Sequence, residues 1–466
     1  MEITDYKKIY FVGIGGIGVS ALARMFQAQG LEISGSDMRD SATVQELKKL
    51  GVQVFIGHDL ANLSGKPDLV IYSEDISPDS AGFIELQEAD KLGITKMTYA
   101  QALGKLMDTK FGIGVTGTNG KSTTTALLGL ILEQAGLDPS VIVGSKLSPK
   151  NESDKFKANA RLGAGNIFVA EADEYHRHML EAHPKMIVIT NIAEDHLDYY
   201  KDLEDIRSAF EEYVHGLPKD GIIIYNADDH NAVEVGRTAL CHKFTFGIDH
   251  YADLQAINLK AEAGRQTLDL HLNDELIGRV ELRVPGKFNV SNALGATLAA
   301  LKLGVSFDVI KTALENFAGI WRRFEVVGML EGKPVISDYA HHPAGVAGTI
   351  QAAKEFYPGK KILVVFQPHH RNRTKALFGQ FVESLIDADY VILPEIFDVA
   401  GREHGEEISS KDLVAELTKQ KEGAEFTPDL DSAAELIKNK IKDFDAVLCM
   451  GAGDIDLMAR KLVHDS

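Results

Sequence analysis

Residues 112–125 read Gly-Ile-Gly-Val-Thr-Gly-Thr-Asn-Gly-Lys-Ser-Thr-Thr-Thr, and they are the most informative run of the chain. A β-prone run at 110–116 leads into a glycine loop, then into a lysine, hydroxyl residues and an apolar helical pattern at 126–134. Glycines let backbone N–H groups turn toward an anion, and the helix N-terminus adds a partial positive charge. We therefore predict a phosphate-binding loop in which Lys121 reaches the terminal phosphates and Ser122 ligates Mg²⁺. An ordinary strand-to-helix turn is the other interpretation of the same residues.

The composition excludes several classes of protein. A chain of 466 residues suggests roughly three domains. Its 49 lysines and arginines stand against 68 aspartates and glutamates, a formal net charge of -19, which argues against a nucleic-acid backbone as the main partner. The two cysteines, Cys241 and Cys449, are too isolated for a disulfide framework or a zinc site. Without a secretory pattern or a bilayer-length apolar run, we expect a cytoplasmic protein with no membrane partner.

Three blocks follow one another along the chain, and we place them at 1–108, 109–316 and 317–466. The first and third alternate short apolar runs with helical stretches, which is the βα rhythm of a parallel sheet. The middle block begins with the strand at 111–116, and its part at 243–284 alternates apolar and polar residues as antiparallel strands do. We predict an α/β protein with Rossmann-like first and third domains and a central P-loop ATPase-type domain that carries an antiparallel addition.

The first block carries its own glycine loop at residues 13–18, which satisfies G-x-G-x-x-G between a predicted strand and a predicted helix. Asp37 follows the second strand, and taken alone this pattern indicates NAD. The same loop fits any pyrophosphate at a helix N-terminus, including that of a UDP-sugar. Because a second, ATP-like loop follows, we favour a nucleotide-linked substrate in the first domain and ATP in the second. An NAD-dependent oxidoreductase remains the alternative.

Acidic and imidazole side chains follow two predicted strands of the middle block. Glu171 ends one strand, and the run at 191–196, which includes Asp195 and His196, follows another. The carboxyl ends of parallel strands meet at one crevice, beside the loop that carries Lys121. Oxygen ligands there suit Mg²⁺, and a neutral imidazole suits a second metal. Asp195 fits equally well as a helix cap.

Further polar residues follow strands of the third block or open helices. Asn289 and Asn292 can face a nucleobase edge or cap a helix. Arg322 and Arg323 suit the charge on a transferring phosphoryl group. The runs at 338–343 and 367–374 place histidines, a tyrosine and arginines where we expect contacts with a polar substrate.

With these motifs in their order and spacing, the chain resembles the Mur ligase family. The resemblance runs over nearly the whole length, and its motifs are FVGIGGIGVSALA, GTNGKSTTT, EADE, TNIAEDHLDYY, PGKFNVSNALGA, RRFE, DYAHHP, FQPHHRNRTK and GAGDI. It implies three domains, which bind a UDP-substrate (1–108), bind ATP (109–316) and bind the amino acid while closing over the site (317–466).

The resemblance also implies roles for individual residues. The ATP contacts are Gly117, Thr118, Asn119, Gly120, Lys121, Ser122, Thr123, Asn289, Asn292, Arg323 and Asp338. The substrate contacts are Gly15, Gly16, Gly18, Ser36 and Asp37 at the UDP end, with Tyr339, His341 and Arg373 where the sugar acid meets the amino acid. The metal ligands are Ser122, Glu171 and His196, and the catalytic groups are Lys121, His196, Arg323 and His341.

The activity implied by the resemblance is ligation that consumes ATP with Mg²⁺. L-alanine is joined to UDP-N-acetylmuramate through an acyl phosphate, with ADP and phosphate as products, in peptidoglycan precursor synthesis. A murein-recycling ligase, which attaches a preformed peptide to the same sugar nucleotide, is the nearest alternative. A non-catalytic binding protein on the same scaffold is another. We expect a monomer or a weak homodimer.

Overall fold

The computed structural model describes residues 3–148, 151, 153, 156–196, 199–262, 265–397 and 408–464. Within them, helices and strands alternate and the strands form three sheets, which confirms the α/β class. The chain divides into two compact units. The first comprises Met1–Ile257, Asp269–Val280 and Val290–Asn316, and the second Asn258–Leu268, Glu281–Asn289 and Phe317–Ser466. No helix in the described residues has the length and apolar character needed to cross a bilayer.

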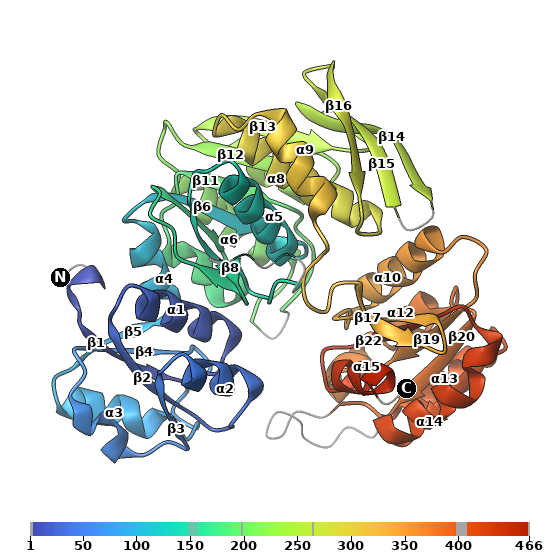
Figure 1. Ribbon diagram of the computed structural model, residues 1–466, viewed down its shortest axis with the longest axis horizontal. Helices are drawn as coiled ribbons and strands as arrows, with labels where there is room; N and C mark the ends of the chain where they lie inside the picture. Colours follow the sequence, from blue (N-terminus) through green and yellow to red (C-terminus); the bar gives the residue numbers. More distant parts are fainter. Residues whose placement is uncertain are drawn as a thin grey trace. The chain divides into compact units, whose positions relative to one another are not determined.

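The first sheet has the strand order β3-β2-β1-β4-β5 and is parallel throughout. Apolar side chains leave it on both faces: Phe11 and Ile71 join one core cluster, Tyr10 and Val70 the other. Figure 1 shows α1 on one side of this sheet and α3 on the other, in blue. The elements are β1 (Lys8–Val12), α1 (Ile17–Ala28), β2 (Glu32–Asp37), α2 (Ala42–Lys49), β3 (Gln53–Ile56), β4 (Leu69–Tyr72), α3 (Phe83–Lys91), β5 (Thr95–Thr98) and α4 (Tyr99–Met107).

The central sheet has the strand order β16-β15-β14-β13-β12-β11-β6-β10-β7-β9-β8. Its middle strands, from β13 to β7, are parallel. The strands are β6 (Phe111–Thr116), β7 (Ser140–Ile142), β8 (Phe156–Lys157), β9 (Ala160–Arg161), β10 (Ile167–Glu171), β11 (Met186–Ile189), β12 (Ile222–Asn226), β13 (His242–Gly247), β14 (Leu254–Glu262), β15 (Arg265–Leu272) and β16 (Glu275–Leu282). The helices are α5 (Lys121–Gln134), α6 (Leu203–His215), α7 (His230–Thr238), α8 (Lys287–Lys302) and α9 (Phe307–Asn316).

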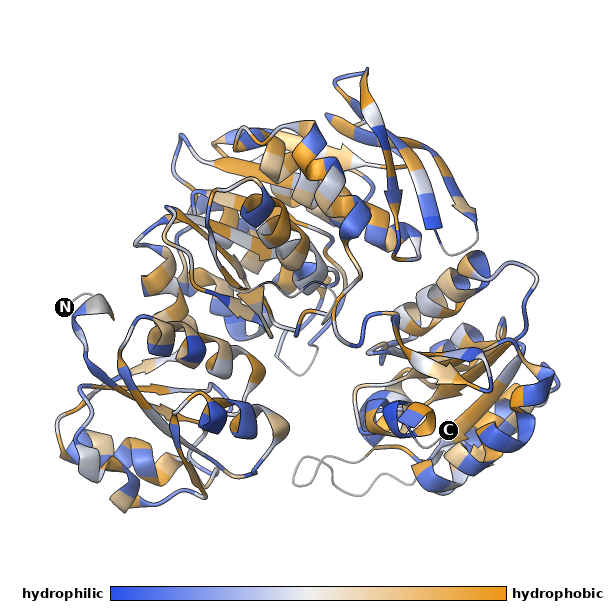
Figure 2. Ribbon diagram, in the orientation of Figure 1, coloured by the Kyte–Doolittle hydropathy of each residue, from blue (hydrophilic) through white to orange (hydrophobic). Residues whose placement is uncertain are grey.

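The expected antiparallel addition lies at one edge of the central sheet. Strands β15 and β16 are joined by only two residues, Asn273 (φ 49°) and Asp274 (φ 68°). Positive φ at both positions is the signature of a type I′ hairpin turn, which joins antiparallel strands. In Figure 2 hydrophilic and hydrophobic residues alternate along β14 to β16, as in strands with one face in water.

The third sheet has the strand order β17-β18-β22-β19-β20-β21, with only β17 and β18 antiparallel among its described pairs. Val364 and Phe366 pack with α10 and α12, whereas Leu363 and Val365 pack with α14 and α15, so helices cover both faces. The elements are β17 (Glu325–Leu330), β18 (Lys333–Asp338), α10 (Pro343–Phe356), β19 (Ile362–Phe366), α11 (Arg371–Ala376), α12 (Phe378–Leu385), β20 (Tyr390–Pro394), α13 (Ser410–Leu417), β21 (Ala424–Thr427), α14 (Leu430–Lys440), β22 (Ala446–Met450) and α15 (Ile455–His464).

Candidate active site

The second glycine loop connects β6 to α5 and has a backbone that only glycine fits at two positions. Gly117 has φ 129° and Gly120 has φ 89°. A Cβ atom on Gly117 would lie 2.2 Å from the Thr190 hydroxyl, and one on Gly120 would lie 2.2 Å from Oδ1 of Asn292. Side chains are therefore excluded both by the dihedral angle and by packing. The N-terminus of α5 begins directly after this turn, at Lys121.

The loop is also held from outside by the segment that follows β11. The Thr118 N–H donates to the Asn191 carbonyl at 2.9 Å, and the Asn119 N–H donates to Oδ1 of Asn191 at 3.1 Å. Thr190 donates its hydroxyl to the Asn119 carbonyl at 2.6 Å. The loop conformation is thus fixed before any ligand arrives, which reduces the cost of ordering it around an anion.

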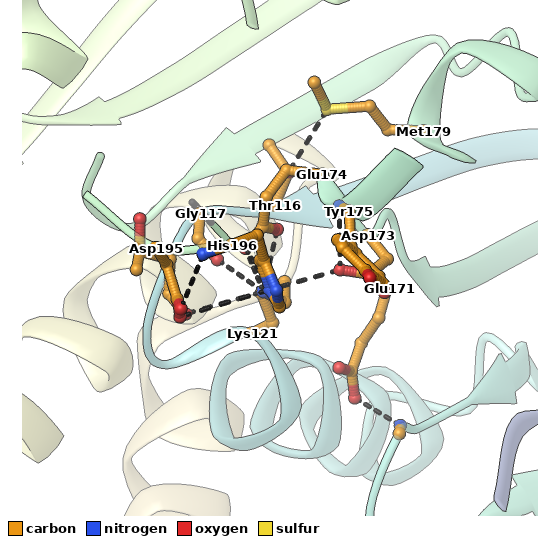
Figure 3. A network of polar contacts seen from close by, with 12 residues as sticks. Thr116, Gly117, Lys121, Glu171, Asp173, Glu174, Tyr175, Met179, Asp195 and His196 are labelled. Carbon is orange, nitrogen blue, oxygen red and sulfur yellow. Dashed lines mark hydrogen bonds and ion pairs between the residues drawn. The ribbon is translucent and has the colours of Figure 1, made fainter. Parts of the chain in front are cut away.

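Lys121 points back into the loop and ends among carboxylates (Figure 3). Its Nζ lies 2.8 and 2.9 Å from the two carboxylate oxygens of Glu174, 2.8 Å from the Gly117 carbonyl and 3.9 Å from Asp173. Burial alone would lower the pKa of Lys121, but the charges of Glu174 and Asp173 outweigh it and raise the pKa to about 12. The group is therefore a cation at any physiological pH.

Ser122 and Glu171 form an oxygen pair next to this lysine. The Ser122 hydroxyl donates to Oε2 of Glu171 at 3.0 Å, and the Gly144 N–H donates to the other carboxylate oxygen. Burial raises the pKa of Glu171, because it disfavours the charged form. A hydroxyl and a carboxylate are the donors that Mg²⁺ prefers, so the chemistry of this pair fits the ion.

His196 lies with a second group of possible metal ligands. Ligand atoms of Asp173, Glu174 and His196 lie within 4.8 Å of one another, and the His196 ring stacks on Tyr175 at 4.3 Å between centroids. The predicted ligands Ser122 and Glu171 are thus hydrogen-bonded to each other, while His196 groups with two acids that the sequence analysis did not assign.

Asp195 does not cap the next helix that the structure describes. The next helix, α6, begins at Leu203, and its N-cap is Asp202, whose side chain accepts the N–H of Asp205. Asp195 instead accepts the N–H of His196 at 2.8 Å, at a residue with a φ of 53°. Its carboxylate therefore lies beside the imidazole in a loop.

One cavity of about 400 Å³ in the first unit is lined by the first glycine loop and by Lys121, the first residue of the helix that follows the second loop. Gly16 and Gly18 are the glycines of the first loop that line it. Helix α4 contributes Tyr99 and Met107 to the cavity wall. The cavity is large enough for a small-molecule ligand that bridges the two loops.

The other residues predicted for the UDP end lie behind the first loop. The Gly15 N–H donates to Oδ2 of Asp37 at 2.9 Å. Ser36 is fully buried and donates its hydroxyl to Glu85 at 2.6 Å. His58 contacts the same glutamate at 3.1 Å, so Ser36 belongs to a buried polar network under the loop.

The two asparagines predicted to face adenine are buried in the first two turns of α8. The Asn289 side-chain amide donates to the Pro285 carbonyl at 2.7 Å. Asn292 places its Oδ1 against the α-carbon of Gly120, as the glycine packing shows. Asn292 thereby joins α8 to the phosphate loop.

In the second unit, the predicted nucleotide residues gather at the end of β18. Asp338 is buried and accepts the N–H groups of Phe324 and Ala340, each at 2.7 Å. Burial raises the pKa of Asp338, against the nearby charge of Arg323. The exposed Arg323 lies over the Tyr339 ring at 5.2 Å from its centroid.

A basic, imidazole-rich cluster surrounds His369 in the same unit. The His341 ring lies 6.4 Å from that of His369, which stacks on Phe397 at 5.3 Å. Burial and the charges of His370, His341 and Arg373 lower the pKa of His369 to about 4. Nδ1 of His369 is buried and has no hydrogen-bond partner among the described residues. Such a cluster suits a carboxylate ligand.

Sequence reasoning missed several residues of the site. Glu174 stands in the EADE run, but nothing in the sequence distinguishes it from Glu171 as a partner for Lys121. His176 and His178 line the cavity, and His176 has a left-handed φ of 51°. The excess of histidines after EADE was the available signal.

Comparison with known proteins identifies the class. Models of the Mur ligase family match three successive segments: the Mur ligase family catalytic domain at residues 8–111, the Mur ligase middle domain at 115–300 and the Mur ligase glutamate ligase domain at 322–453. The chain belongs to the Mur ligase family, and the resemblance seen in its motifs is confirmed.

Individual relatives sharpen this assignment. The chain is 37% identical to the UDP-N-acetylmuramate–L-alanine ligase of Caldanaerobacter subterraneus subsp. tengcongensis, with 100% of this chain and 99% of the relative covered. Its fold is similar to that of the UDP-N-acetylmuramate–alanine ligase MurC of Thermotoga maritima, with a TM-score of 0.83, 30% identity and 98% of both chains covered. A murein peptide ligase of Psychrobacter arcticus gives a TM-score of 0.71 at 25% identity, again over 98% of both chains. The expected three-domain Mur ligase architecture is thereby confirmed.

Proposed function

We propose that this chain joins L-alanine to UDP-N-acetylmuramate, with ATP converted to ADP and phosphate, in peptidoglycan precursor synthesis. The observation that supports the proposal is the cavity that the first glycine loop and Lys121 line, because ligation needs a sugar nucleotide and a triphosphate tail to meet. Full-length similarity to a ligase named for L-alanine supports the choice of amino acid. We place UDP-substrate binding in 1–108, ATP binding in 109–316 and amino-acid binding in 317–466.

ATP binds, in this proposal, with its phosphates on the second glycine loop. The backbone N–H groups of Gly117–Thr123 and the start of α5 hold the phosphates, and Lys121 neutralises the terminal one. Asn289 and Asn292 then face adenine, and Arg323 and Asp338 complete the nucleotide site from the third block.

Mg²⁺ fits two sets of ligands on this chain. Ser122 and Glu171 would hold one ion, and His196 another, because they supply hydroxyl, carboxylate and imidazole donors. Bound there, the ions would neutralise negative charge on the phosphates.

The reaction follows from the weakness of a carboxylate as an acyl donor. A carboxylate oxygen of UDP-N-acetylmuramate attacks the γ-phosphorus, the bond to the β,γ-bridging oxygen breaks, and ADP leaves. The L-alanine amine then attacks the carbonyl carbon of the acyl phosphate, and the tetrahedral intermediate expels phosphate. Lys121 and Arg323 stabilise the negative charge that develops on the phosphoryl oxygens.

Substrate positioning and proton transfer complete the assignment. The UDP end of the substrate is held by five residues of the first domain: Gly15, Gly16, Gly18, Ser36 and Asp37. Tyr339, His341 and Arg373 line the meeting point of the sugar acid and the amino acid, where Arg373 pairs with a carboxylate. We assign His341 as an acceptor of the proton that the amine loses. The cytoplasmic location and a monomer or weak homodimer stay predictions.

Phosphate release tests the proposal directly. The chain is incubated with ATP, Mg²⁺ and UDP-N-acetylmuramate, and L-alanine, glycine, L-serine and a tripeptide are compared as amine substrates. We expect the highest kcat/KM with L-alanine. Release with the tripeptide alone would assign the chain to murein recycling. Nucleotide binding without phosphate release would indicate a non-catalytic binding protein. Tight NAD binding without ATP binding would indicate an oxidoreductase.

A further inference from the structure

The ammonium group that phosphoryl transfer needs is already bound by the chain itself. Nζ of Lys121 lies 2.8 and 2.9 Å from the two oxygens of Glu174 and 2.8 Å from the Gly117 carbonyl (Figure 3). A lysine ammonium has three N–H donors, so these acceptors engage all of them. A terminal phosphate on the loop must therefore displace at least one of these partners before Lys121 can bind it.

Glu174 is the partner whose position the surrounding chain fixes. Its side chain is 3% exposed. Its backbone carbonyl accepts the Tyr200 hydroxyl and, at 2.9 Å, the Arg177 N–H. Tyr200 is itself buried in the core cluster under α6. The backbone therefore holds the carboxylate next to the loop, and only the side chain can rotate away.

The carboxylate and an incoming phosphate are both anions, and they compete for the same cation. Coulomb attraction between Lys121 and Glu174 is strong at this distance and burial, as the raised pKa of Lys121 indicates. When Lys121 turns to a phosphate, Glu174 is left as a buried, uncompensated charge, which is costly.

Two other side chains lie where they could bind a cation together with Glu174. Asp173 and His196 have ligand atoms within 4.8 Å of a Glu174 oxygen. His196 Nε2 is 4.0 Å from Oε1 of Glu174. A divalent cation at these atoms would neutralise the carboxylate that Lys121 releases.

We propose that Glu174 is a positioning residue that holds Lys121 in the free enzyme, competes with the terminal phosphate for it, and makes tight nucleotide binding depend on a divalent cation. This inference rests on the ATP site of the proposed function. It assigns a role to Glu174 that is separate from the metal ligands Ser122 and Glu171.

Two isosteric variants separate the effect of Glu174 from general electrostatics. Glu174→Gln removes the charge and keeps the size and an acceptor oxygen. Glu204→Gln is the matched control, because its carboxylate is 78% exposed and pairs with Arg207 on the surface of α6. The Kd of ATP is measured by calorimetry for both variants and the unaltered chain, first with EDTA and then with Mg²⁺.

In EDTA, we expect Glu174→Gln to bind ATP about tenfold more tightly than the unaltered chain, and Glu204→Gln to leave the Kd unchanged. With Mg²⁺ the difference between Glu174→Gln and the unaltered chain should shrink. A damaged fold would weaken binding, so a gain in metal-free affinity cannot come from a merely structural role.

Equal or weaker metal-free binding by Glu174→Gln would overturn the proposal. If that variant does not fold, Glu174→Asp replaces it. The shorter side chain keeps the charge but holds Lys121 less closely, so metal-free ATP binding should tighten about threefold. An unchanged Kd in Glu174→Asp would also overturn the proposal. Absence of ATP binding to the unaltered chain with Mg²⁺ would reject the proposed function instead, so the two failures are distinguishable.

Discussion

The two glycine loops of the first unit differ in the charges around them, although both connect a strand to the N-terminus of a helix. One cavity is lined by Gly16 and Gly18 of the first loop and by Lys121, directly after the second. In the first loop the Gly15 N–H is bound by the Asp37 carboxylate. In the second, Lys121 is the one lysine or arginine among the described residues that line the cavity, and it is surrounded by Glu171, Asp173 and Glu174.

The glycine spacing therefore predicts a loop that can bind a pyrophosphate, but it does not predict which reaction takes place there. A loop that offers N–H groups and a helix N-terminus can position an anion. Stabilising charge that grows in a transition state needs cations placed at the reacting atoms. We therefore expect changes in the second loop to reduce kcat and changes in the first to raise the KM of the sugar nucleotide.

The largest effect is expected for Lys121→Ala. Loss of the ammonium group removes the charge that faces the transferring phosphoryl group, so kcat for phosphate release should fall by about a thousandfold or more. Steady-state phosphate release measures it, and the melting temperature checks that the fold survives. Lys91→Ala is the control, since this lysine pairs on the surface of α3 with Glu88. Near-normal turnover in Lys121→Ala would remove the phosphate-loop assignment.

The next largest effect is expected from adding a side chain to the backbone of each glycine loop. Gly120→Ala adds a Cβ at φ 89° and 2.2 Å from Asn292, so we expect a loss of about 1–3 kcal/mol in the free energy of unfolding, together with weaker ATP binding. Gly16→Ala adds one at φ -59°, where the nearest atom is 3.4 Å away. Its stability should change by less than about 0.5 kcal/mol, while the KM of the sugar nucleotide rises.

Urea denaturation and substrate titration of both glycine variants provide the measurement. Equal destabilisation by the two substitutions would mean that the loops are under the same packing constraint. An unchanged sugar-nucleotide KM in Gly16→Ala would count against a ligand at the first loop.

Much of the fold was predictable because local signals agree with tertiary structure. The strand at 111–116 lies where the sequence analysis placed it, since the apolar β-prone run stops at a glycine there. Strand β17 was not predicted. It is an edge strand with mostly half-exposed residues and a central Gly328, so it carries neither a core run nor a clean alternation.

Only the site residues that belong to recognisable sequence motifs could be predicted. The sequence predicts Lys121 and Ser122 after a glycine loop and Glu171 at a strand end, and the structure places the three together. The pairing of Lys121 with Glu174 depends on a turn in which His176 and Arg177 take left-handed φ values of 51° and 58°. Residue propensities do not predict such a conformation for these side chains.

A smaller effect than loss of Lys121 is expected for Glu171→Gln. The amide keeps the size of the side chain and loses the charge, so the Mg²⁺ concentration for half-maximal phosphate release should rise about tenfold. The change should shrink at saturating Mg²⁺, unlike that of Lys121→Ala. Glu212→Gln is the control, because its carboxylate pairs with Arg177 at 2.9 Å and is 61% exposed. An unchanged Mg²⁺ titration would reject Glu171 as a ligand.

The smallest effect is expected for Asp37→Asn. The amide oxygen can still accept the Gly15 N–H, but the bond loses its charge assistance, so the first loop is held less firmly. We expect the KM of UDP-N-acetylmuramate to rise about two- to fivefold while kcat and the KM of ATP stay the same, because the proposed reaction places the transferred phosphoryl group at Lys121 and not at this loop. Initial rates with each substrate varied in turn measure all three constants. A fall in kcat comparable to that of Glu171→Gln would show that the first loop takes part in the chemistry, and the contrast between the two loops would then be wrong.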